Sequence, residues 1–285
     1  MMKKALNYDN IISMVVDYFN KEKDLSNIKL FLLDMDGTIY NENQIFDGTL
    51  DFLSYVERIG GKYIFITNNS SKSVDDYVIK VNKMGIKANR DNFYTSTQAT
   101  ASYIKEKLGD VLVFASGTKS FVKELKEYGI KVTTRLNKNI KAIVMGHDTE
   151  LNYSKLRKLS ELLLLDVPYI ATNPDLVCPV SFGYTPDCGS VAIMLENATG
   201  KKPIYIGKPE PTMINFVMKK YGYSKEETCV IGDRVYTDIA SGLNAGVCSI
   251  CLLSGESTLK TIEDDPRKPT LVFKDIRELY NELNR

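Results

Sequence analysis

Histidine is nearly absent from this sequence of 285 residues, in which His147 is the single imidazole. A zinc site built from several histidines is therefore excluded. A serine or cysteine nucleophile activated by histidine would have to use His147, because the sequence has no second candidate. The sequence thus offers little for histidine-based chemistry.

Cysteines are also few, and their spacing lacks the close pairing of a metal site. An odd number of thiols without such pairing indicates reduced cysteines in a cytoplasmic protein. Two of them lie within the apolar, strand-like run GVCSICLL, where residues 248 and 251 should point to opposite faces. We therefore expect neither a redox nor a zinc role for that pair. The five are Cys178, Cys188, Cys229, Cys248 and Cys251.

An excess of charge of either sign is missing as well. The chain has 37 Lys and Arg against 36 Asp and Glu, a formal net charge of +1. This balance argues against nucleic acid or a membrane surface as the partner. No stretch reaches the roughly 18 apolar residues that a spanning helix needs.

The N-terminal segment has no signal-type apolar run, because Asp9 and Asp17 interrupt it. Its apolar residues instead recur at a helical spacing. We therefore expect residues 1–26 to form an amphipathic helical extension that packs on the body of the protein. The apolar face would consist of Ile11, Ile12, Val15, Val16 and Phe19.

From residue 28 onward, short apolar runs alternate with amphipathic helical segments. Runs such as IKLFLLD, YIFITNN and CVIGD resemble buried strands, and the helix that follows Ser73 has a capping residue at its start. Continuous apolar strands between helices predict an α/β protein with a mainly parallel, Rossmann-like sheet. The remaining predicted strands of this sheet are PIYIGKP, GVCSICLL and PTLVF.

A second α/β stretch occupies the middle of the chain, without a Ser- or Pro-rich linker at either edge. The polar strand-end residues lie before and after it, and hardly within it. We therefore expect an inserted domain at 108–201, and a core formed by 27–107 and 202–285.

Polar residues gather where the predicted core strands end, and such strand ends meet at one edge of a parallel sheet. They include three acids, one lysine, and hydroxyl and amide groups. Three carboxylates around one point need a cation, and hard oxygen ligands favour Mg²⁺ over zinc. The lysine suits a phosphate group. These residues are Asp34, Asp36, Thr67, Asn68, Asn69, Lys208 and Asp233.

Such a site suits phosphoryl transfer. Asp34 can attack phosphorus to form an aspartyl-phosphate. Asp36, two residues further on, can protonate the leaving alcohol and then activate water. Strand alternation places both acids on one side, and Gly37 lets the chain turn away.

Four segments in order resemble the motifs of the haloacid dehalogenase (HAD) superfamily of phosphatases. They are DMDGT at 34–38, ITNNS at 66–70, GKP at 207–209 and GDRVYTD at 232–238. The long gap between the second and third is similar to the branch with a large cap inserted there. Segments such as GHDTELNYSKL and IATNPD resemble NagD-like and p-nitrophenylphosphatase-like members.

The resemblance implies a role for each matching residue. Asp34 would be the nucleophile and Asp36 the general acid and base. Asp34, the main-chain carbonyl of Asp36 and Asp233 would bind Mg²⁺, and Asp238 would support these ligands. The phosphoryl group would be bound by Thr67, Asn68 and Lys208, with Asn69 shaping the same loop.

The same resemblance makes 108–201 the cap that selects the substrate. The loop 176–189 would hang over the site, and Tyr184, Pro186 and Asp187 are candidate specificity residues, with an ordinary surface loop as the alternative. His147 is expected to have a structural or cap-closing role. Two copies of the chain would pair through their caps.

The function expected is therefore a Mg²⁺-dependent phosphomonoesterase of the cytoplasm. Its substrate would be a small phosphorylated metabolite, such as a sugar phosphate or a nucleoside monophosphate. Two alternatives remain: a phosphotransferase or mutase that uses the same intermediate, and a ligand-binding homologue without catalysis. Intact motif residues count against the last of these.

Overall fold

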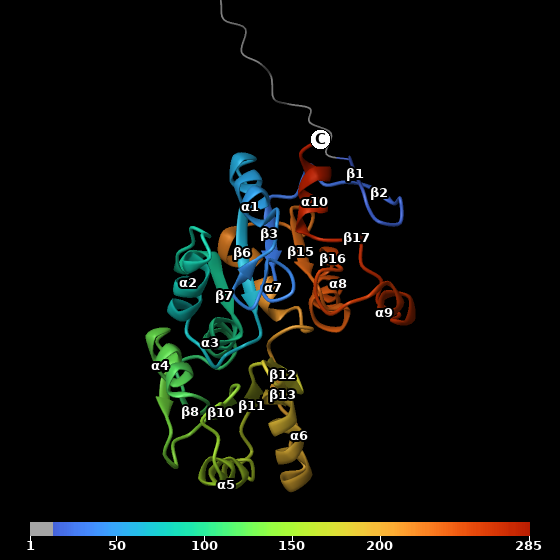
Figure 1. The fold of residues 1–285 in the computed structure, drawn as a ribbon. Helices are drawn as coiled ribbons and strands as arrows, with labels where there is room; N and C mark the ends of the chain where they lie inside the picture. Colours follow the sequence, from blue (N-terminus) through green and yellow to red (C-terminus); the bar gives the residue numbers. More distant parts are fainter. Residues whose placement is uncertain (1–13) are drawn as a thin grey trace, which may run out of the picture.

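The computed structural model describes residues 14–285, which form an α/β protein with two parallel sheets. One sheet has six strands and lies in the upper part of the molecule in Figure 1, and the other has five and lies in the lower part. Three small two-stranded hairpins accompany them. The predicted fold class is confirmed.

The six-stranded sheet has the order β17-β16-β15-β3-β6-β7, and every neighbouring pair is parallel. Its central strand β3 is buried throughout. Alternate residues of β3 face opposite sides: Phe31 joins one hydrophobic cluster and Leu32 the other. The strands are β3 (Leu30–Leu33), β6 (Lys62–Thr67), β7 (Phe93–Thr95), β15 (Thr228–Gly232), β16 (Cys248–Leu252) and β17 (Leu271–Phe273).

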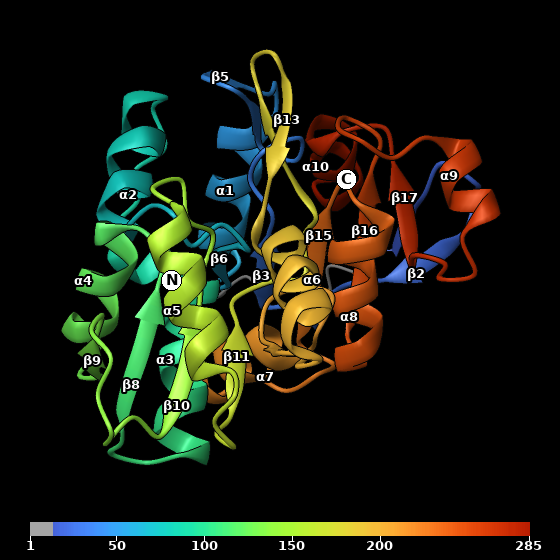
Figure 2. The same cartoon turned by 90° about the horizontal axis from the view of Figure 1, so that it is seen from below.

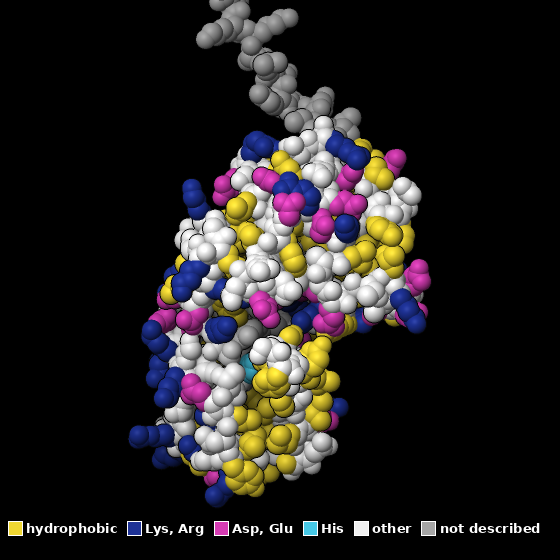
Figure 3. Space-filling model, viewed as in Figure 1, with side chains coloured by type: hydrophobic (Ala, Val, Ile, Leu, Met, Phe, Trp, Pro, Cys, Tyr) yellow, Lys and Arg dark blue, Asp and Glu magenta, His cyan; other side chains and the backbone are white. Residues whose placement is uncertain are grey.

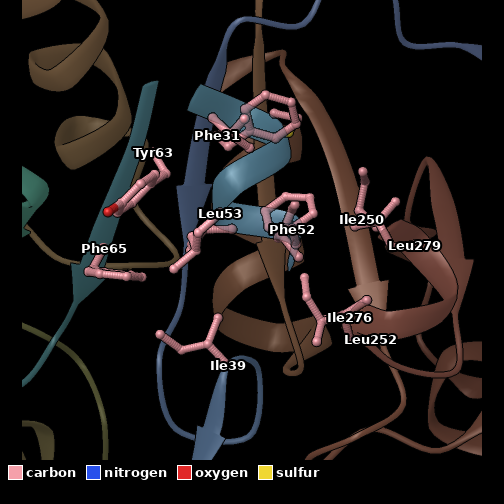
Figure 4. Close-up of a cluster of buried hydrophobic side chains, with 14 of the residues drawn as sticks. Phe31, Ile39, Phe52, Leu53, Tyr63, Phe65, Ile250, Leu252, Ile276 and Leu279 are labelled. Atoms are coloured by element: carbon pink, nitrogen blue, oxygen red, sulfur yellow. The ribbon is translucent and has the colours of Figure 1, made fainter. Parts of the chain in front are cut away.

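Helices α1 (Thr49–Arg58) and α10 (Ile276–Leu283) cover one face of this sheet. In Figure 4, Phe52 from α1 and Ile276 from α10 lie in the cluster that contains Phe31, with the Phe31 and Phe52 rings 5.6 Å apart. Each such fully buried side chain contributes about 1.5–3 kcal/mol to folding. The apolar spacing of α1 therefore fixes which side of the helix meets the sheet.

The opposite face packs against α3 (Ser96–Lys107), α7 (Thr212–Tyr221) and α8 (Ala240–Ala245). Helix α2 (Val74–Lys83) begins at the predicted cap, where Ser73 and Asp76 form a capping box. Helix α9 (Leu259–Asp264) packs Ile262 near β17. The short elements β4 (Tyr40–Asn41), β5 (Gln44–Ile45) and η1 (Arg90–Asn92) complete this part of the chain.

The five-stranded sheet has the order β14-β11-β10-β8-β9, again entirely parallel. Helices α5 and α6 pack in a cluster of their own, whereas α4 joins the large cluster that also holds residues of β3 and β6. One apolar core is thus continuous between the two sheets. The elements are β8 (Leu112–Ser116), α4 (Lys119–Glu127), β9 (Lys131–Thr133), β10 (Ala142–Met145), α5 (Tyr153–Leu162), β11 (Tyr169–Ala171), α6 (Cys188–Thr199) and β14 (Ile204–Tyr205).

A hairpin of β12 (Val177–Val180) and β13 (Gly183–Pro186) connects β11 with α6. In Figure 1 it lies at the junction between the upper and lower parts of the molecule. Figure 2, turned by 90°, shows it projecting beyond helix α6. Its side chains are mostly exposed.

Two expectations about secondary structure are wrong. Residues 14–26 contain the antiparallel strands β1 (Met14–Val16) and β2 (Glu22–Asp24) instead of a helix, because the Asp17 carboxylate accepts the main-chain N–H groups of Phe19 and Lys21 and turns the chain. The rest of that predicted helix lies outside the described residues. The run PIYIGKP belongs to the second sheet, where the half-exposed β14 pairs with β11.

All five cysteines carry free thiols. Within residues 14–285, every helix is too short or too polar to pass through a bilayer.

Candidate active site

The predicted acids lie at the point where the strand order of the six-stranded sheet reverses. From β3 the chain proceeds to β6 and β7 on one side, and it later returns to β15 on the other side of β3. The carboxyl ends of β3 and its two neighbours therefore flank a crevice of the kind that binds ligands in open α/β sheets. Asp34 follows β3, Thr67 ends β6, and Asp233 follows β15.

Three carboxylates meet in this crevice. One oxygen from each of Asp34, Asp233 and Asp238 lies within 4.8 Å of the others. Asp238 comes from the π-helical turn η2 (Val235–Ile239), a kind of irregularity that recurs at functional sites. Asp233 and Asp238 are buried, whereas Asp34 is partly accessible.

Lys208 is the cation that the structure places among these acids. Its Nζ lies 2.6 Å from Oδ1 of Asp34 and 2.5 Å from Oδ1 of Asp238, and the residue is only 3% exposed. Burial alone would lower the pKa of Lys208, but the two carboxylates raise it above its ordinary value. The ammonium group is therefore permanently charged. Lys208 follows β14, which belongs to the five-stranded sheet. Its side chain therefore reaches across to the ends of the six-stranded sheet from the unit that contains the five-stranded one.

The acids fit a divalent cation. Burial raises the pKa values of Asp233 and Asp238, and repulsion from Asp34 adds to the effect at both residues. One lysine does not balance three carboxylates that lie so close together. Hard oxygen donors in this number are those that Mg²⁺ and Ca²⁺ prefer, and such an ion would keep the carboxylates ionised.

Gly37 makes the close approach between β3 and β15 possible. Its φ is +84°, and a Cβ atom at this position would lie 2.5 Å from Oδ2 of Asp233. The adjacent Thr38 donates its hydroxyl to Oδ1 of Asp233 at 3.3 Å, and the main-chain N–H of Glu256 donates to Oδ2 at 2.8 Å. The turn at Gly37 and Thr38 thus also helps to position Asp233.

Asp36 lies at the solvent-accessible edge of the site. Its Oδ1 is 3.5 Å from Nζ of Lys80, and its Oδ2 accepts the Tyr40 hydroxyl at 3.3 Å. Lys80 also lies 4.0 Å from the centre of the Tyr40 ring. Loss of hydration raises the pKa of Asp36, with Lys80 opposing the shift and Asp34 adding to it. Asp36 is therefore held apart from the buried acids.

The loop after β6 is fixed by its own side chains. Oδ1 of Asn68 accepts the main-chain N–H of Lys208 at 2.8 Å, and Nδ2 donates to the Lys208 carbonyl at 2.8 Å and to Asp175 at 3.0 Å. Oδ1 of Asn69 accepts from the main chain and hydroxyl of Ser71. Since the Asn68 amide is fully engaged and the Asn69 oxygen is occupied, contacts between this loop and a phosphoryl group would come from its main chain and from the Thr67 hydroxyl.

The three predicted specificity residues have different surroundings. Tyr184 and Pro186 lie on the exposed strand β13, and Tyr184 is 67% exposed. Asp187 is buried and caps helix α6, where its Oδ1 accepts the main-chain N–H of Cys188. The structure therefore separates Asp187 from the other two.

Three charged residues near the site were missed from the sequence. They are Lys80 beside Asp36, Asp175 beside Asn68, and Arg234. Burial alone would lower the pKa of Arg234, but the nearby acids, chiefly Asp34, raise it above its ordinary value. Arg234 lies in the motif GDRVYTD and Asp175 in the segment IATNPD, so their place in these segments could have marked them as site residues. Lys80 sits mid-helix and gave none.

Comparison with known proteins agrees with this arrangement. Residues 31–131 match the family model of haloacid dehalogenase-like hydrolases, and residues 205–279 match the model of HAD-hydrolase-like proteins. The two matches contain Asp34 and Thr67, and Lys208 and Asp233, respectively.

Relatives match over nearly the whole chain. An acid sugar phosphatase of Staphylococcus saprophyticus is 31% identical over 92% of this chain and 100% of its own length. The structure of a 4-nitrophenylphosphatase from Thermotoga maritima has a TM-score of 0.85 and 38% identity, over 90% of this chain and 98% of its own. A glycerol phosphate phosphatase from Mycobacterium tuberculosis in complex with magnesium has a TM-score of 0.84 and 27% identity, over 92% and 79%. Structures of NagD proteins are similar as well.

The fold and the acid–lysine crevice define a hydrolase of the HAD type. The chain belongs to the NagD-like, p-nitrophenylphosphatase-like phosphatases of this superfamily. The predicted family and the predicted phosphatase activity are thereby confirmed.

Proposed function

We propose that this phosphatase is a Mg²⁺-dependent phosphomonoesterase that acts through an aspartyl-phosphate on Asp34. The observation that carries the proposal is the contact of Nζ of Lys208 with both Asp34, at 2.6 Å, and Asp238, at 2.5 Å. A charged lysine beside an accessible carboxylate is suited to guide a phosphoryl group to it.

In the first step, an oxygen of Asp34 attacks phosphorus while the bond to the leaving alcohol breaks. The Lys208 ammonium group and main-chain N–H groups after β6 would stabilise the negative phosphoryl oxygens. The ligands of the cation would be Asp34, the main-chain carbonyl of Asp36 and Asp233. When bound, Mg²⁺ supplies positive charge to the transferring group. Asp238 would hold Lys208, to which it is bonded.

Asp36 would manage the protons. Its raised pKa favours the protonated form that can donate to the leaving oxygen. Once ionised, the same carboxylate can take a proton from the water that attacks the aspartyl-phosphate. Its place at the solvent-accessible edge would give it access to both the leaving group and solvent.

The unit with the five-stranded sheet would act as the cap that selects the substrate. Figure 3 shows a hollow between the upper and lower parts of the molecule, and the β12–β13 hairpin lies at their junction. A cap over the crevice favours small metabolites over phosphoproteins. We favour sugar phosphates, because a relative of nearly equal length is named an acid sugar phosphatase. Tyr184 and Pro186 would be tested first for contacts with the leaving group.

Two further proposals concern the setting of the enzyme. Hydrophobic side chains gather on the lower part of the molecule in Figure 3, which supports a homodimer formed through the cap. Five free thiols support a cytoplasmic location. The exposed apolar residues of the hairpin and α6 are Leu176, Val177, Val180, Phe182, Tyr184, Ile193 and Met194.

The decisive experiment is phosphate release from a panel of metabolites, with Mg²⁺ and with chelator. We expect Asp34→Asn to abolish turnover while circular dichroism shows an unchanged fold. Added alcohols would reveal a phosphotransferase by capturing the phosphoryl group. Full activity of Asp34→Asn, or activity unaffected by chelator, would overturn the proposal.

A further inference from the structure

Three potential metal ligands of different chemistry meet outside the acid–lysine crevice. His147 follows β10, Cys178 belongs to β12, and Asp187 caps α6. One ligand atom from each lies within 4.8 Å of the other two. His147 and Asp187 are buried and Cys178 is partly buried. An imidazole nitrogen, a sulfur and a carboxylate oxygen thus converge from three separate segments.

Nδ1 of the His147 imidazole faces the Asp187 carboxylate. Nδ1 is buried and lies 3.2 Å from Oδ2 of Asp187, yet it makes no hydrogen bond with any residue in the described part of the chain. Two atoms bound to one tetrahedral Zn²⁺ at the usual bond lengths lie about 3.3 Å apart. The observed separation of 3.2 Å matches that of two neighbouring ligands.

Asp187 is held so that one oxygen remains for a cation. Its Oδ1 accepts the main-chain N–H of Cys188 and the side-chain amide of Asn173. Oδ2 is the oxygen that faces His147. A carboxylate fixed by hydrogen bonds through one oxygen is typical of a well-oriented metal ligand.

Cys178 completes the set from the β12–β13 hairpin. Its strand pairs only with β13 in a two-stranded hairpin, and its Sγ has just a weak contact, 3.8 Å from the carbonyl of Pro179. This sulfur lies within 4.8 Å of the ligand atoms of His147 and Asp187. The thiol would bind as the thiolate and release its proton to solvent.

We propose that His147, Cys178 and Asp187 form a second metal site, which binds a thiophilic divalent cation such as Zn²⁺. The mixed nitrogen, sulfur and oxygen set suits Zn²⁺ and not Mg²⁺, which prefers oxygen ligands. A thiolate and a carboxylate together balance the charge of the ion. Three protein ligands leave the fourth position for water.

Binding there would tie the hairpin to the cap and steady its position over the crevice. The segment that leads into the hairpin already contacts the core, because Oδ2 of Asp175 accepts from Asn68 at 3.0 Å. On the other side, the main-chain N–H of His147 donates to the Ser70 hydroxyl at 2.9 Å. The metal would therefore join elements that each touch the loop after β6.

Cobalt(II) distinguishes this site from the catalytic one. We would strip the purified full chain with chelator and titrate it with Co²⁺, recording the thiolate-to-metal charge-transfer absorption. The catalytic crevice holds no cysteine ligand, so it cannot produce this band. We expect the band to saturate at one equivalent of Co²⁺ per chain and to vanish in Cys178→Ser. In His147→Gln, the affinity for Co²⁺ should fall at least tenfold. The matched control, Cys248→Ser, should keep it in full.

Zinc content and hairpin protection provide the second measurement. After dialysis against Zn²⁺ and gel filtration, the wild-type protein should retain one more equivalent of zinc per chain than Cys178→Ser. Hydrogen exchange at residues 177–186 should slow with Zn²⁺ in the wild type alone. An absent charge-transfer band, a band that survives Cys178→Ser, or equal zinc content in the two proteins would overturn the site. None of these results depends on the phosphatase mechanism.

Discussion

Nζ of Lys208 lies 2.6 Å from Oδ1 of Asp34, although 174 residues separate them in the sequence and their nearest strands belong to different sheets. The contact joins the end of β14 to the end of β3. The positive charge in the crevice therefore depends on the position of the unit that contains the five-stranded sheet. The lysine is therefore both a candidate phosphate ligand and a link between the two halves of the molecule.

Replacing Lys208 by Met should lower kcat at least about a hundredfold, the usual cost of losing one charged or hydrogen-bonding group that stabilises a transition state. Steady-state kinetics on the best substrate of the panel would measure this loss. Lys201→Met is the matched control, because Lys201 is an exposed lysine just before the same strand. A Lys208→Met enzyme with near-normal kcat would rule out the proposed role. Circular dichroism would separate that loss from misfolding.

Replacing Gly37 by Ala should both destabilise the fold and weaken binding of Mg²⁺. The added Cβ would lie 2.5 Å from Oδ2 of Asp233 and would require φ of +84°. Gly60→Ala is the control: its φ is +68°, but a Cβ there meets nothing within 4 Å. We expect about 1 kcal/mol for the control, from backbone strain alone, and about 2–3 kcal/mol more for Gly37. Urea unfolding and Mg²⁺ titration of both variants would test this, and equal losses would contradict it.

The sequence predicted that the motif residues come together because they sit at ends of strands that alternate with helices. Asp34, Thr67 and Asp233 all lie at the ends of strands that are recognisable as apolar runs, and the order of these strands brings the three residues together. Lys208 was found for a partly wrong reason, since its strand pairs in the other sheet. Register of a two-residue edge strand is decided by tertiary packing, which no local pattern records.

The error at the N-terminus has a similar cause. The helix expected over 1–26 rested on apolar spacing, but the Asp17 side chain bonds the main chain and closes a hairpin instead. His147, Cys178 and Asp187 come from three segments, so no spacing rule connects them. The expectation of no redox or zinc role concerns only Cys248 and Cys251, and this group does not bear on it.

Glu124 should make stability depend on pH. It is buried in α4, and burial raises its pKa to about 7, although the Val74 N–H that its Oε1 accepts at 3.1 Å opposes the shift. Between its unfolded value of 4.5 and about 7, the native state holds the proton more tightly, so its contribution to stability falls as pH rises. Full ionisation would cost up to about 3 kcal/mol.

Glu124→Gln stays neutral and can still accept the Val74 N–H. We therefore expect this variant to match the wild type near pH 4.5 and to exceed it in free energy of unfolding at pH 8. Urea titrations at both values would measure the difference. Glu161→Gln, on the exposed part of α5, is the control and should show no such gain. A constant offset at the two pH values would contradict the argument.

Replacing Asp17 by Ala should detach the N-terminal hairpin from the sheet. Oδ2 of Asp17 accepts the main-chain N–H of Val272 in β17 at 3.1 Å, and its Oδ1 accepts two N–H groups of the turn. Removing the carboxylate leaves a buried donor unpaired, at a cost of about 1–3 kcal/mol. Unfolding experiments and hydrogen exchange at Val272 would detect this loss. Asp24→Ala is the control, because among residues 14–285 the Asp24 carboxylate accepts only from Ser26, whose main-chain N–H lies at 2.8 Å in an exposed hydrogen bond. If both variants lose the same stability, the hairpin is held by its apolar contacts, such as those of the buried Val15, and not by this carboxylate.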